Sequence, residues 1–491
     1  MEKKKPDIPL LVILLIYAII YSLISLVNHY NFRTYGWDLG LYNNALYDYS
    51  HFQWNDETLV LPYLKISNSL GDHFSLLPLL FSPLVWLFGS WTMLLIQIAA
   101  VLWGGYGLFR FVFRLTGGKG ISYCALVYFF SLWGIYSALS FDYHDNVVAA
   151  MLLPWFVYEV YEKKYFKASL YLFFILVAKE NMALWMFFVC AGLAWLLGKE
   201  KMSLKYLAGA ALVSALYFIL VTKWVIPSIA GQDTGYIHFR YDAAGHTMKE
   251  VFLFVISHPV QAFTLLFENH SGLPGWNGIK SELHFVVLFS GGIVLLFYPQ
   301  FLLMLIPVYF QKLFHNEPEK WGIYYQYSVE YVPVLAMAVF YAISRFRDRR
   351  LKQMLQYVAP LMAMIITFSV IENPVYKYSL LEQARFYRKS HYEREFDVKE
   401  VHGALKKIPP AAKVSAQNML VPHLALRDTI YYFPYLGDAE YVALLPGARS
   451  SYPLTEKRYH HFLDSLRHDS LWCTLHDDGN LLLLVKKNKS R

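Results

Sequence analysis

An acidic residue, Asp38, lies in an aromatic stretch shortly after the first long apolar segment of the chain. The stretch reads Tyr35-Gly36-Trp37-Asp38-Leu39-Gly40. A carboxylate held at a membrane boundary can take a proton from a hydroxyl group while a lipid-borne substrate lies alongside in the bilayer. The alternative is a solvated loop acid, which position alone favours, so the interpretation depends on the residues that accompany Asp38.

Several other ionisable residues interrupt or end apolar segments. Such groups are costly in a membrane and usually face a cavity or a partner. Each also has a simpler explanation, because Asp72 and Asp145 can cap helices and His144 can be an ordinary loop residue. We nevertheless predict that the set gathers on one membrane face: Asp38, Asp72, His73, Asp142, His144, Asp145 and Glu180.

This set of residues suits the transfer of a sugar from a polyprenyl phosphate. The reaction needs a base that deprotonates the acceptor hydroxyl and groups that stabilise the departing phosphate. Asp38 would be the base. His73, His144 and Lys179 would contact the phosphate, and Glu180 would orient the site.

A divalent cation is the alternative way to hold the phosphate. Asp72, Asp142 and Glu180 could gather such an ion. The spacing of Asp142, His144 and Asp145 also allows metal ligation, but the mixed residue types make this a weak signal. We favour a metal-free site by a narrow margin.

The long loop over 231–282 contains Trp276 within the sequence Pro274-Gly275-Trp276-Asn277-Gly278. This loop would cover the site and present aromatic surface to a sugar. A surface loop that rests on the lipid headgroups is an equally good interpretation.

The elements that must position these residues are membrane helices. The chain is 56% hydrophobic and only 16% charged, far more apolar than a soluble protein of 491 residues needs to be. Its net charge of +8 is interpreted as topogenic charge beside helices, since no basic and aromatic nucleic-acid module is present. The three cysteines indicate neither a disulfide framework nor a metal site.

Apolar windows and basic loops predict about eleven crossings, with a cytoplasmic N-terminus and an extracytoplasmic C-terminus. The segment 9–27 follows the basic residues 1–5 and is interpreted as a retained signal anchor, because no small-residue cleavage site follows it. The first external loop covers 28–90. The further spans are expected at 91–113, 121–139, 147–161, 167–197 with an interruption, 206–225, 283–298, 301–314, 328–344 and 354–371.

Two segments depart from simple spans. The segment 74–88 is short and contains Pro78 and Pro83, so we expect a half-inserted or membrane-parallel helix. The stretch 167–197 is broken by Lys179-Glu180-Asn181, which predicts two short helices with these polar residues near the outer surface.

The composition changes after residue 371, which predicts a transmembrane domain over 1–371 and a soluble extracytoplasmic domain over 372–491. Short strands are expected at 412–416, 439–444 and 481–485, and helices at 398–407 and 457–467. This pattern predicts a small α/β or α+β domain that positions substrate or docks a partner.

The residues also resemble a known family. The order Trp37-Asp38-Leu39-Gly40, Asp72-His73-Phe74-Ser75, Phe141-Asp142-Tyr143-His144 and Lys179-Glu180-Asn181, with Pro422-His423-Leu424 downstream, is similar to an uncharacterised family of bacterial and archaeal predicted membrane proteins. That family resembles the GT-C glycosyltransferases in its first external loop acid and its helix break. The resemblance implies a GT-C-like bundle, a polyprenyl-phosphate-linked sugar donor and Asp38 as the base.

The sequence therefore predicts a cell-envelope glycosyltransferase in the bacterial cytoplasmic membrane, acting at its outer face on an unnamed acceptor. A secondary transporter is one alternative, but it would be expected to show interrupted helices in two matching halves, and only one clear break is found. A non-catalytic envelope assembly protein is another. The transferase predicts that Asp38, His73, His144 and Glu180 converge on one outward-facing cavity.

Overall fold

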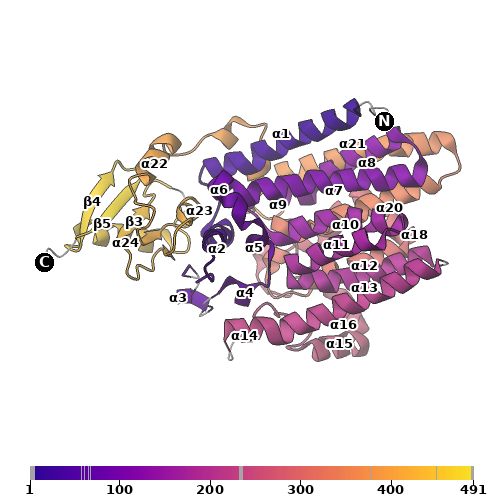
Figure 1. Cartoon of the computed structure of the whole chain (residues 1–491), viewed down its shortest axis with the longest axis horizontal. Helices are drawn as coiled ribbons and strands as arrows, with labels where there is room; N and C mark the ends of the chain where they lie inside the picture. Colours follow the sequence, from indigo (N-terminus) through magenta and orange to yellow (C-terminus); the bar gives the residue numbers. More distant parts are fainter. Residues whose placement is uncertain are drawn as a thin grey trace. The chain divides into compact units, whose positions relative to one another are not determined.

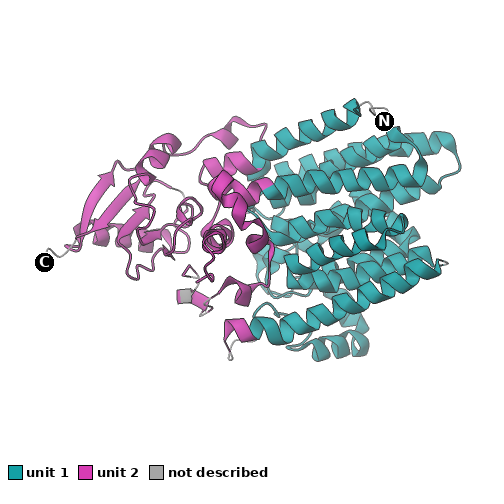
Figure 2. Ribbon diagram, viewed as in Figure 1, with its two compact units in different colours: residues 1–24, 96–227, 233–385 teal, residues 25–95, 228–232, 386–491 magenta. Residues whose placement is uncertain are grey.

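The protein is mostly helical, with a small sheet near its C-terminus. The computed structural model describes residues 6–56, 58–59, 61–64, 66, 68–198, 200–231, 236–377, 379–448 and 450–487. The basic residues 1–5, interpreted as a cytoplasmic tag, lie outside the described residues. The chain forms two compact units, which Figure 2 distinguishes by colour.

Unit 1 comprises Met1–Ile24, Ile96–Pro227 and Asp233–Arg385. It is a bundle of apolar helices in which α12 packs along α13 and α8 along α21 (Figure 1). The bundle contains the first part of α1 (Ile8–Tyr30), most of α7 (Thr92–Thr116), α8 (Lys119–Ser131), α9 (Trp133–Leu139), α10 (Asp145–Tyr161), α11 (Tyr165–Ala178), α12 (Glu180–Leu197), α13 (Lys201–Leu220), α15 (Met248–Ser257), α16 (Pro259–Thr264), α17 (Ile279–Val287), α18 (Val294–Phe297), α19 (Pro299–Leu313), α20 (Tyr331–Arg345) and α21 (Arg349–Glu372).

Five helices in the described residues are long and apolar enough to cross a membrane, or up to seven if two bent pairs each count as one span. The eleven crossings expected from the sequence are not confirmed. The difference arises because several expected spans are short or broken helices. Helix α10 has 17 residues, α11 has 14 and α19 has 15, and a π-helical turn separates α17 from α18.

The break predicted at Lys179 is confirmed. Helix α11 ends at Ala178 and α12 begins at Glu180, while Lys179 has extended backbone angles, φ −164° and ψ 141°. The sequence predicted two short helices at this break. Helix α12 has 18 residues and is long enough to span a membrane by itself, so only α11 is short. A polar side chain at such a break is held at the ends of two helices rather than on the face of one.

Unit 2 comprises Ser25–Leu95, Ser228–Gln232 and Phe386–Arg491. The expected first external loop and the C-terminal segment therefore belong to one compact unit. Its helices are α2 (Leu41–Ser50), α3 (Leu61–Leu64), α4 (Ser69–Asp72), α5 (Leu77–Phe81), α6 (Val85–Phe88), α22 (Val398–Leu405), α23 (Val421–Leu424) and α24 (Glu456–His468). The segment expected as a half-inserted or membrane-parallel helix at 74–88 consists of the short helices α5 and α6, with a 3₁₀ turn containing Pro83 between them.

The sheet of unit 2 has five strands in the order β2-β1-β3-β5-β4. The strands are β1 (Val414–Ala416), β2 (Ile430–Tyr432), β3 (Tyr441–Leu444), β4 (Trp472–Asp477) and β5 (Leu482–Lys486). Strand β1 pairs in parallel with β2 and β3, whereas β5 is antiparallel to β3 and β4. Strands β1, β3 and β5 and helices α22 and α24 were predicted, whereas β2, β4 and the short helix α23 were missed.

Alternating side chains along the strands build two cores. Leu482 and Leu484 of β5 face α24 and pack with its Leu463, whereas Leu483 faces the opposite core. That second core also contains Phe32 and Leu59 from the first external loop. Because successive side chains of a strand point to opposite faces, a five-residue apolar strand can supply both cores at once.

Hydrogen bonds join the first external loop to the C-terminal segment inside unit 2. The Gly36 amide donates to Asn418 Oδ1 at 2.7 Å, Asn43 Nδ2 donates to the Pro422 carbonyl at 2.9 Å, and Asn44 Nδ2 donates to the Arg427 carbonyl at 2.9 Å. The imidazoles of His29 and His423 stack with ring centroids 4.2 Å apart. The turn that carries Asp38 is thus fixed by residues some 380 positions later in the chain.

The two glycines beside Asp38 allow this close approach. A Cβ on Gly40 would lie 2.7 Å from Val421 Cγ1, and one on Gly36 would lie 2.8 Å from the Tyr432 ring. We expect Gly40→Ala to lower the free energy of unfolding by about 1–3 kcal/mol, because the added methyl group overpacks the contact. Thermal unfolding in detergent would measure this change.

Gly403→Ala is the matched control, since nothing lies within 4 Å of a Cβ at this position of α22. It should be neutral or slightly stabilising, because alanine is the better helix former. Equal unfolding temperatures for Gly40→Ala and the wild type would contradict the tight contact at Val421.

Candidate functional site

The Asp38 carboxylate lies in a turn lined by aromatic rings. Residues Gly36–Gly40 form a single π-helical turn that leads directly into α2. The Trp37 ring lies 5.7 Å from the Tyr63 ring and 5.6 Å from the Tyr432 ring, measured between centroids. Asp38 is close enough to Tyr432 for its charge to raise the pKa of that phenol, although burial is the larger cause. A partly exposed carboxylate in such aromatic surroundings is a suitable proton acceptor.

Asp72 and His73 lie in the same unit as Asp38. Asp72 ends the short helix α4, and the His73 amide donates to the Ser69 carbonyl at 3.1 Å. The next helix, α5, begins only at Leu77, so the alternative that Asp72 caps a helix beginning at Phe74 is wrong. Both side chains are half-buried.

Unit 2 contains a second carboxylate that was not predicted to be functional. Asp48 on α2 is 3% exposed, and Asn55 Nδ2 donates to its Oδ2 at 2.8 Å. Burial raises the pKa of Asp48 to about 7, the hydrogen bond from Asn55 lowers it, and the nearby charges of Asp428 and Asp56 raise it further. The side chain can therefore exchange a proton near neutral pH.

The raised pKa of Asp48 predicts a pH-dependent stability. Between the ordinary aspartate pKa of about 3.9 and the folded value of about 7, the native state keeps a proton that the unfolded chain has lost. The contribution of Asp48 to stability is therefore present at low pH and is lost as the pH rises through this window. Asp48→Asn should flatten this part of the profile, which unfolding temperatures at pH 5 and pH 8 would measure. Parallel profiles for variant and wild type would contradict the assignment.

In unit 1, the loop before α10 is held by a glutamine of α7. Gln97 Nε2 donates to the Asp142 carbonyl at 2.9 Å, and the His144 amide donates to Gln97 Oε1 at 2.9 Å. Gln97 is fully buried. A two-point contact of this kind fixes the backbone on both sides of Tyr143, and an isolated amide in an apolar helix was the sequence signal for it.

The same loop contains two buried acidic residues in different settings. Tyr143 Oη donates to Asp145 Oδ1 at 2.7 Å, and both side chains are almost fully buried. Asp145 is the first residue of α10, where a negative charge is favoured by the helix dipole. Asp142 is also buried but has a left-handed backbone with φ 47°.

A second left-handed residue packs against this loop. Tyr325 has φ 57°, and its ring lies 4.7 Å from that of Phe141, which in turn stacks on His144. Non-glycine residues in this conformation each cost about 1–3 kcal/mol and cluster at ligand sites. Asp142 directly follows Phe141, whose ring contacts Tyr325, so two left-handed residues mark this part of unit 1 as a functional candidate.

The segment between α19 and α20 links the loop to buried charges. Asn146 Nδ2 donates to Glu330 Oε1 at 2.8 Å and contacts the Gln326 carbonyl at 3.2 Å. Lys312 Nζ donates to the Gly322 carbonyl at 2.7 Å and to Ser328 Oγ at 3.2 Å. Glu330 and Lys312 are 6% and 3% exposed and interact electrostatically. Neither residue was among the site residues predicted from the sequence.

The helix break brings Lys179 within electrostatic reach of the same segment. Glu180 is fully buried and accepts a hydrogen bond from Tyr236 Oη at 2.8 Å. The neighbouring Asn181 donates to Gln311 Oε1 at 3.1 Å. Lys179 is half-buried, and its positive charge is close enough to interact with the Glu330 carboxylate. Glu330 thereby links Lys179 to Asn146, at the start of α10.

Trp276 lies in a 3₁₀ turn and its indole stacks on Tyr376 with ring centroids 4.2 Å apart. The Tyr376 amide donates to Tyr324 Oη at 2.6 Å, and Tyr324 donates to Glu282 Oε2 at 2.5 Å. These contacts attach the loop around Trp276 to the end of α21. The role of Trp276 as a sugar-binding surface stays a prediction.

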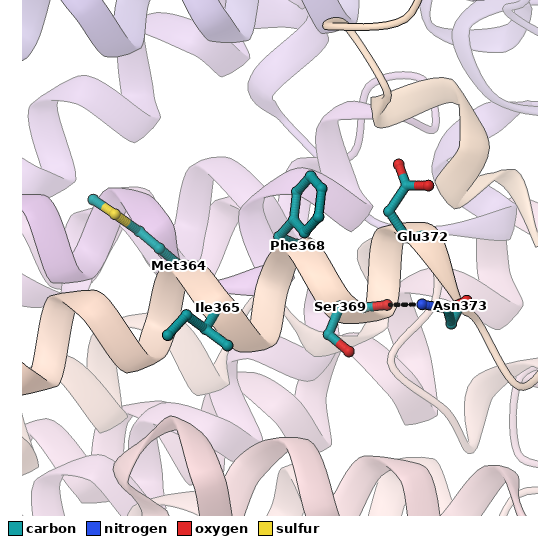
Figure 3. A pocket seen from close by; sticks show the side chains of 6 residues that line it. All are labelled: Met364, Ile365, Phe368, Ser369, Glu372 and Asn373. Atoms are coloured by element: carbon teal, nitrogen blue, oxygen red, sulfur yellow. Dashed lines mark hydrogen bonds between the residues drawn. The ribbon is translucent and has the colours of Figure 1, made fainter.

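An open groove runs along the last turns of α21 (Figure 3). Met364, Ile365 and Phe368 form its apolar part, and Ser369, Glu372 and Asn373 form its polar end. The apolar side chains are about half exposed. An apolar surface that ends in polar groups is suited to the chain of a membrane lipid whose headgroup lies at the polar end.

The structure divides the predicted site residues between the two units. Unit 1 holds Asp142, His144, Lys179, Glu180 and Trp276. The loop of Asp142 and His144 contacts the 315–330 segment through the rings of Phe141 and Tyr325, and Lys179 is within electrostatic reach of Glu330. Unit 2 holds Asp38, Asp72 and His73. Their convergence on one cavity, and the alternative cation site of Asp72, Asp142 and Glu180, stay predictions. A different group in unit 2, formed by Glu400, His476 and Asp478, has ligand-like spacing, but Lys407 Nζ lies 3.3 Å from His476 Nδ1 and opposes a cation there.

Comparison with known proteins places the chain in a family. The sequence model of a family described as "Predicted membrane protein (DUF2079)" matches residues 28–461. The match covers most of the chain, including all of the predicted site residues, so the protein belongs to this family. No curated protein matches the chain.

Proposed function

We propose that this member of the DUF2079 family is a GT-C-like glycosyltransferase that moves a sugar from a polyprenyl phosphate to an acceptor at the outer face of the cytoplasmic membrane. One observation carries the proposal. Polar and charged residues meet at helix ends of an apolar bundle: Asn146 at the start of α10 donates to Glu330 just before α20, and Lys179 at the helix break is within electrostatic reach of Glu330. Charged groups are costly in such a bundle and usually serve a ligand.

In the proposed reaction, Asp38 takes the proton from the acceptor hydroxyl. The acceptor oxygen then forms a bond to the anomeric carbon of the donor, and the bond from that carbon to the phosphate oxygen breaks. The electron pair leaves with the polyprenyl phosphate, and the configuration at the anomeric carbon is inverted. His73 and His144 would contact the phosphate, and Glu180 would orient the site.

The position of the charged groups favours a transferase over a transporter. A transporter would place its polar residues near the middle of interrupted helices in two matching halves. Here Asp145 and Glu180 are each the first residue of a helix, and Glu330 directly precedes α20. The groove of α21 adds a surface for the lipid part of a donor.

The proposal is tested by incubating the purified full-length protein in lipid nanodiscs with polyprenyl-phosphate-linked sugars and envelope glycolipids. Transfer would release free polyprenyl phosphate, which chromatography detects whatever the acceptor is. Release above the protein-free background with at least one donor is the expected result. The absence of release across a panel of hexose, pentose and amino-sugar donors would contradict the proposed function.

A further inference from the structure

The turn between α20 and α21 carries a dense group of basic side chains. Residues 345–352 read Arg345-Phe346-Arg347-Asp348-Arg349-Arg350-Leu351-Lys352. Five cations and one carboxylate in these eight residues give the turn a net charge of +4. Figure 1 shows the turn at the same end of unit 1 as the end of α7 and the start of α13.

Half of the charged side chains in this turn have partners within α20 and α21. Asp348 accepts a hydrogen bond from the Leu351 amide at 2.9 Å and so caps α21. Arg345 Nη2 donates to Tyr341 Oη at 2.8 Å, and Lys352 Nζ donates to a carbonyl near the end of α20 at 3.3 Å. The other three side chains are exposed and, among the described residues, make no hydrogen bond or ion pair: Arg347, Arg349 and Arg350.

The other carboxylates at this end of unit 1 are already engaged or buried. Each half-buried one is bound by a cation of a neighbouring helix end: Asp7 by Lys119 at 2.8 Å, Glu200 by Lys163 at 2.8 Å, and Glu162 by Arg114 and Lys164. Glu159 lies inside α10 and is 5% exposed. Within the described part of unit 1, no carboxylate at this end therefore neutralises the three arginines.

The three arginines have the chemistry of an anion site. They stay charged at any physiological pH, and a guanidinium group matches the geometry of a phosphate with two parallel hydrogen bonds. Their topogenic effect acts while the chain inserts into the membrane. In the folded protein, like charges this close in sequence repel one another, and a bound anion relieves the repulsion.

An exposed apolar stripe runs along α21 from the same turn. Its members recur every three or four residues, so they share one face of the helix, and they are 36–63% exposed: Leu351, Met354, Tyr357, Val358 and Leu361. Helix α21 is long and apolar enough to cross a membrane. The rise from Leu351 to Leu361 is about 15 Å, about half of a hydrocarbon core of about 30 Å. The stripe therefore matches the depth of one lipid leaflet.

We propose that the 345–352 turn and the adjoining stripe of α21 bind an anionic phospholipid. Arg347, Arg349 and Arg350 bind the headgroup phosphate, and an acyl chain lies along the stripe from Leu351 to Leu361. Phe346 is 42% exposed between the basic residues and enters the apolar layer below the headgroups. A soluble anion has no group to cover the stripe, which is why a lipid fits better. This lipid site uses none of the residues of the proposed transfer reaction and is independent of it.

The first experiment compares three ligands. Purified full-length protein in a neutral detergent is titrated with phosphatidylglycerol, with phosphatidylcholine of the same acyl chains, and with glycerol phosphate, and native mass spectrometry counts the bound molecules. Phosphatidylglycerol should bind about tenfold more tightly than phosphatidylcholine, whose choline cation cancels the phosphate charge. Glycerol phosphate should bind about hundredfold more weakly than phosphatidylglycerol, because it lacks the acyl chains.

Either of two results would overturn the lipid site. Equal affinities for the two lipids would show that the headgroup charge is not recognised. Equal affinities for phosphatidylglycerol and glycerol phosphate would assign the arginines to a free anion.

The second experiment removes the charges. The triple variant Arg347→Gln, Arg349→Gln and Arg350→Gln should weaken phosphatidylglycerol binding by about hundredfold, about fivefold for each arginine, and should change phosphatidylcholine binding little. Replacing the same three arginines by lysine keeps the charge and should keep most of the preference. An unchanged preference in the glutamine variant, or its complete loss in the lysine variant, would contradict recognition of the headgroup by charge.

The matched control removes the same number of charges from the same end of unit 1. It combines Lys167→Gln, Lys201→Gln and Lys205→Gln, which are exposed positions on α11 and α13. Phosphatidylglycerol should bind this variant as tightly as it binds the wild type. An equal loss in the two glutamine variants would reveal attraction to net charge alone and overturn the specific site.

The third experiment tests the acyl-chain contact. Met354→Gln with Leu361→Gln places polar groups on the stripe and should weaken binding of both lipids by about fivefold to tenfold. Leu212→Gln with Leu216→Gln is the control, because these leucines of α13 are equally exposed, at 59% and 57%. Unchanged affinity in the α21 variant, or an equal loss in the α13 variant, would overturn the placement of the chain along α21.

Discussion

Asp38→Asn is expected to reduce sugar transfer by about 10²–10⁴-fold, the usual contribution of a general base. Asparagine has nearly the same shape as aspartate but cannot accept a proton from the acceptor hydroxyl. The turn should keep its structure, because the Gly36 amide still donates to Asn418 Oδ1 in the variant. Release of polyprenyl phosphate by the variant in nanodiscs would measure the effect.

Asp56→Asn is the control for this prediction. Asp56 lies in the same expected external loop, is exposed, and loses the same charge on substitution. Its transfer rate should equal that of the wild type, and both variants should unfold at the wild-type temperature. If Asp38→Asn keeps full activity, Asp38 has no part in the mechanism. If it binds undecaprenyl phosphate normally while transfer is lost, the defect lies in the chemical step, as a base requires.

Lys312→Met should destabilise the 315–330 segment by about 3–5 kcal/mol, the usual cost of removing one partner from buried charges. The substitution leaves Glu330 without its buried cation and takes the donor from the Gly322 carbonyl and Ser328 Oγ. Methionine matches the length and shape of the lysine stem, so the lost charge and hydrogen bonds dominate the effect. Hydrogen exchange of peptides from 315–330, together with thermal unfolding, would measure it.

A double-mutant cycle separates this charge effect from a general loss of packing. Glu330→Gln removes the buried negative charge but keeps an acceptor for Asn146. The double variant Lys312→Met with Glu330→Gln should therefore be more stable than the sum of the single effects predicts. Strictly additive effects would show that Lys312 and Glu330 do not interact.

These two predictions concern different units of the protein. Unit 2 holds the proposed base in a turn that the C-terminal segment fixes through Asn418 and Tyr432. Unit 1 holds His144, one of the two proposed phosphate contacts, and the buried pair of Lys312 and Glu330. The C-terminal segment, expected only to dock a partner or position a substrate, thus has a direct part in shaping the turn that carries Asp38.

Local patterns in the sequence were sufficient for several elements. The break at Lys179 follows from three polar residues inside an apolar stretch, and the structure places it there. The strands β1, β3 and β5 and the helices α22 and α24 follow from short apolar runs and helical spacing. Strand β2 was missed because its Ile430-Tyr431-Tyr432 is only three residues long, and β4 because most of its residues are exposed.

The sequence by itself determined that this is a helical membrane protein with polar interruptions and a small C-terminal sheet, because hydropathy and periodicity are local properties of the chain. Only the tertiary structure decided which of those interruptions meet. The number of full spans, the union of the first external loop with the C-terminal segment, and the link from Lys179 through Glu330 to Asn146 all depend on contacts between residues far apart in sequence. Such contacts are selected by packing and by the cost of leaving a buried charge without a partner, and a single sequence does not reveal which partner will meet that need.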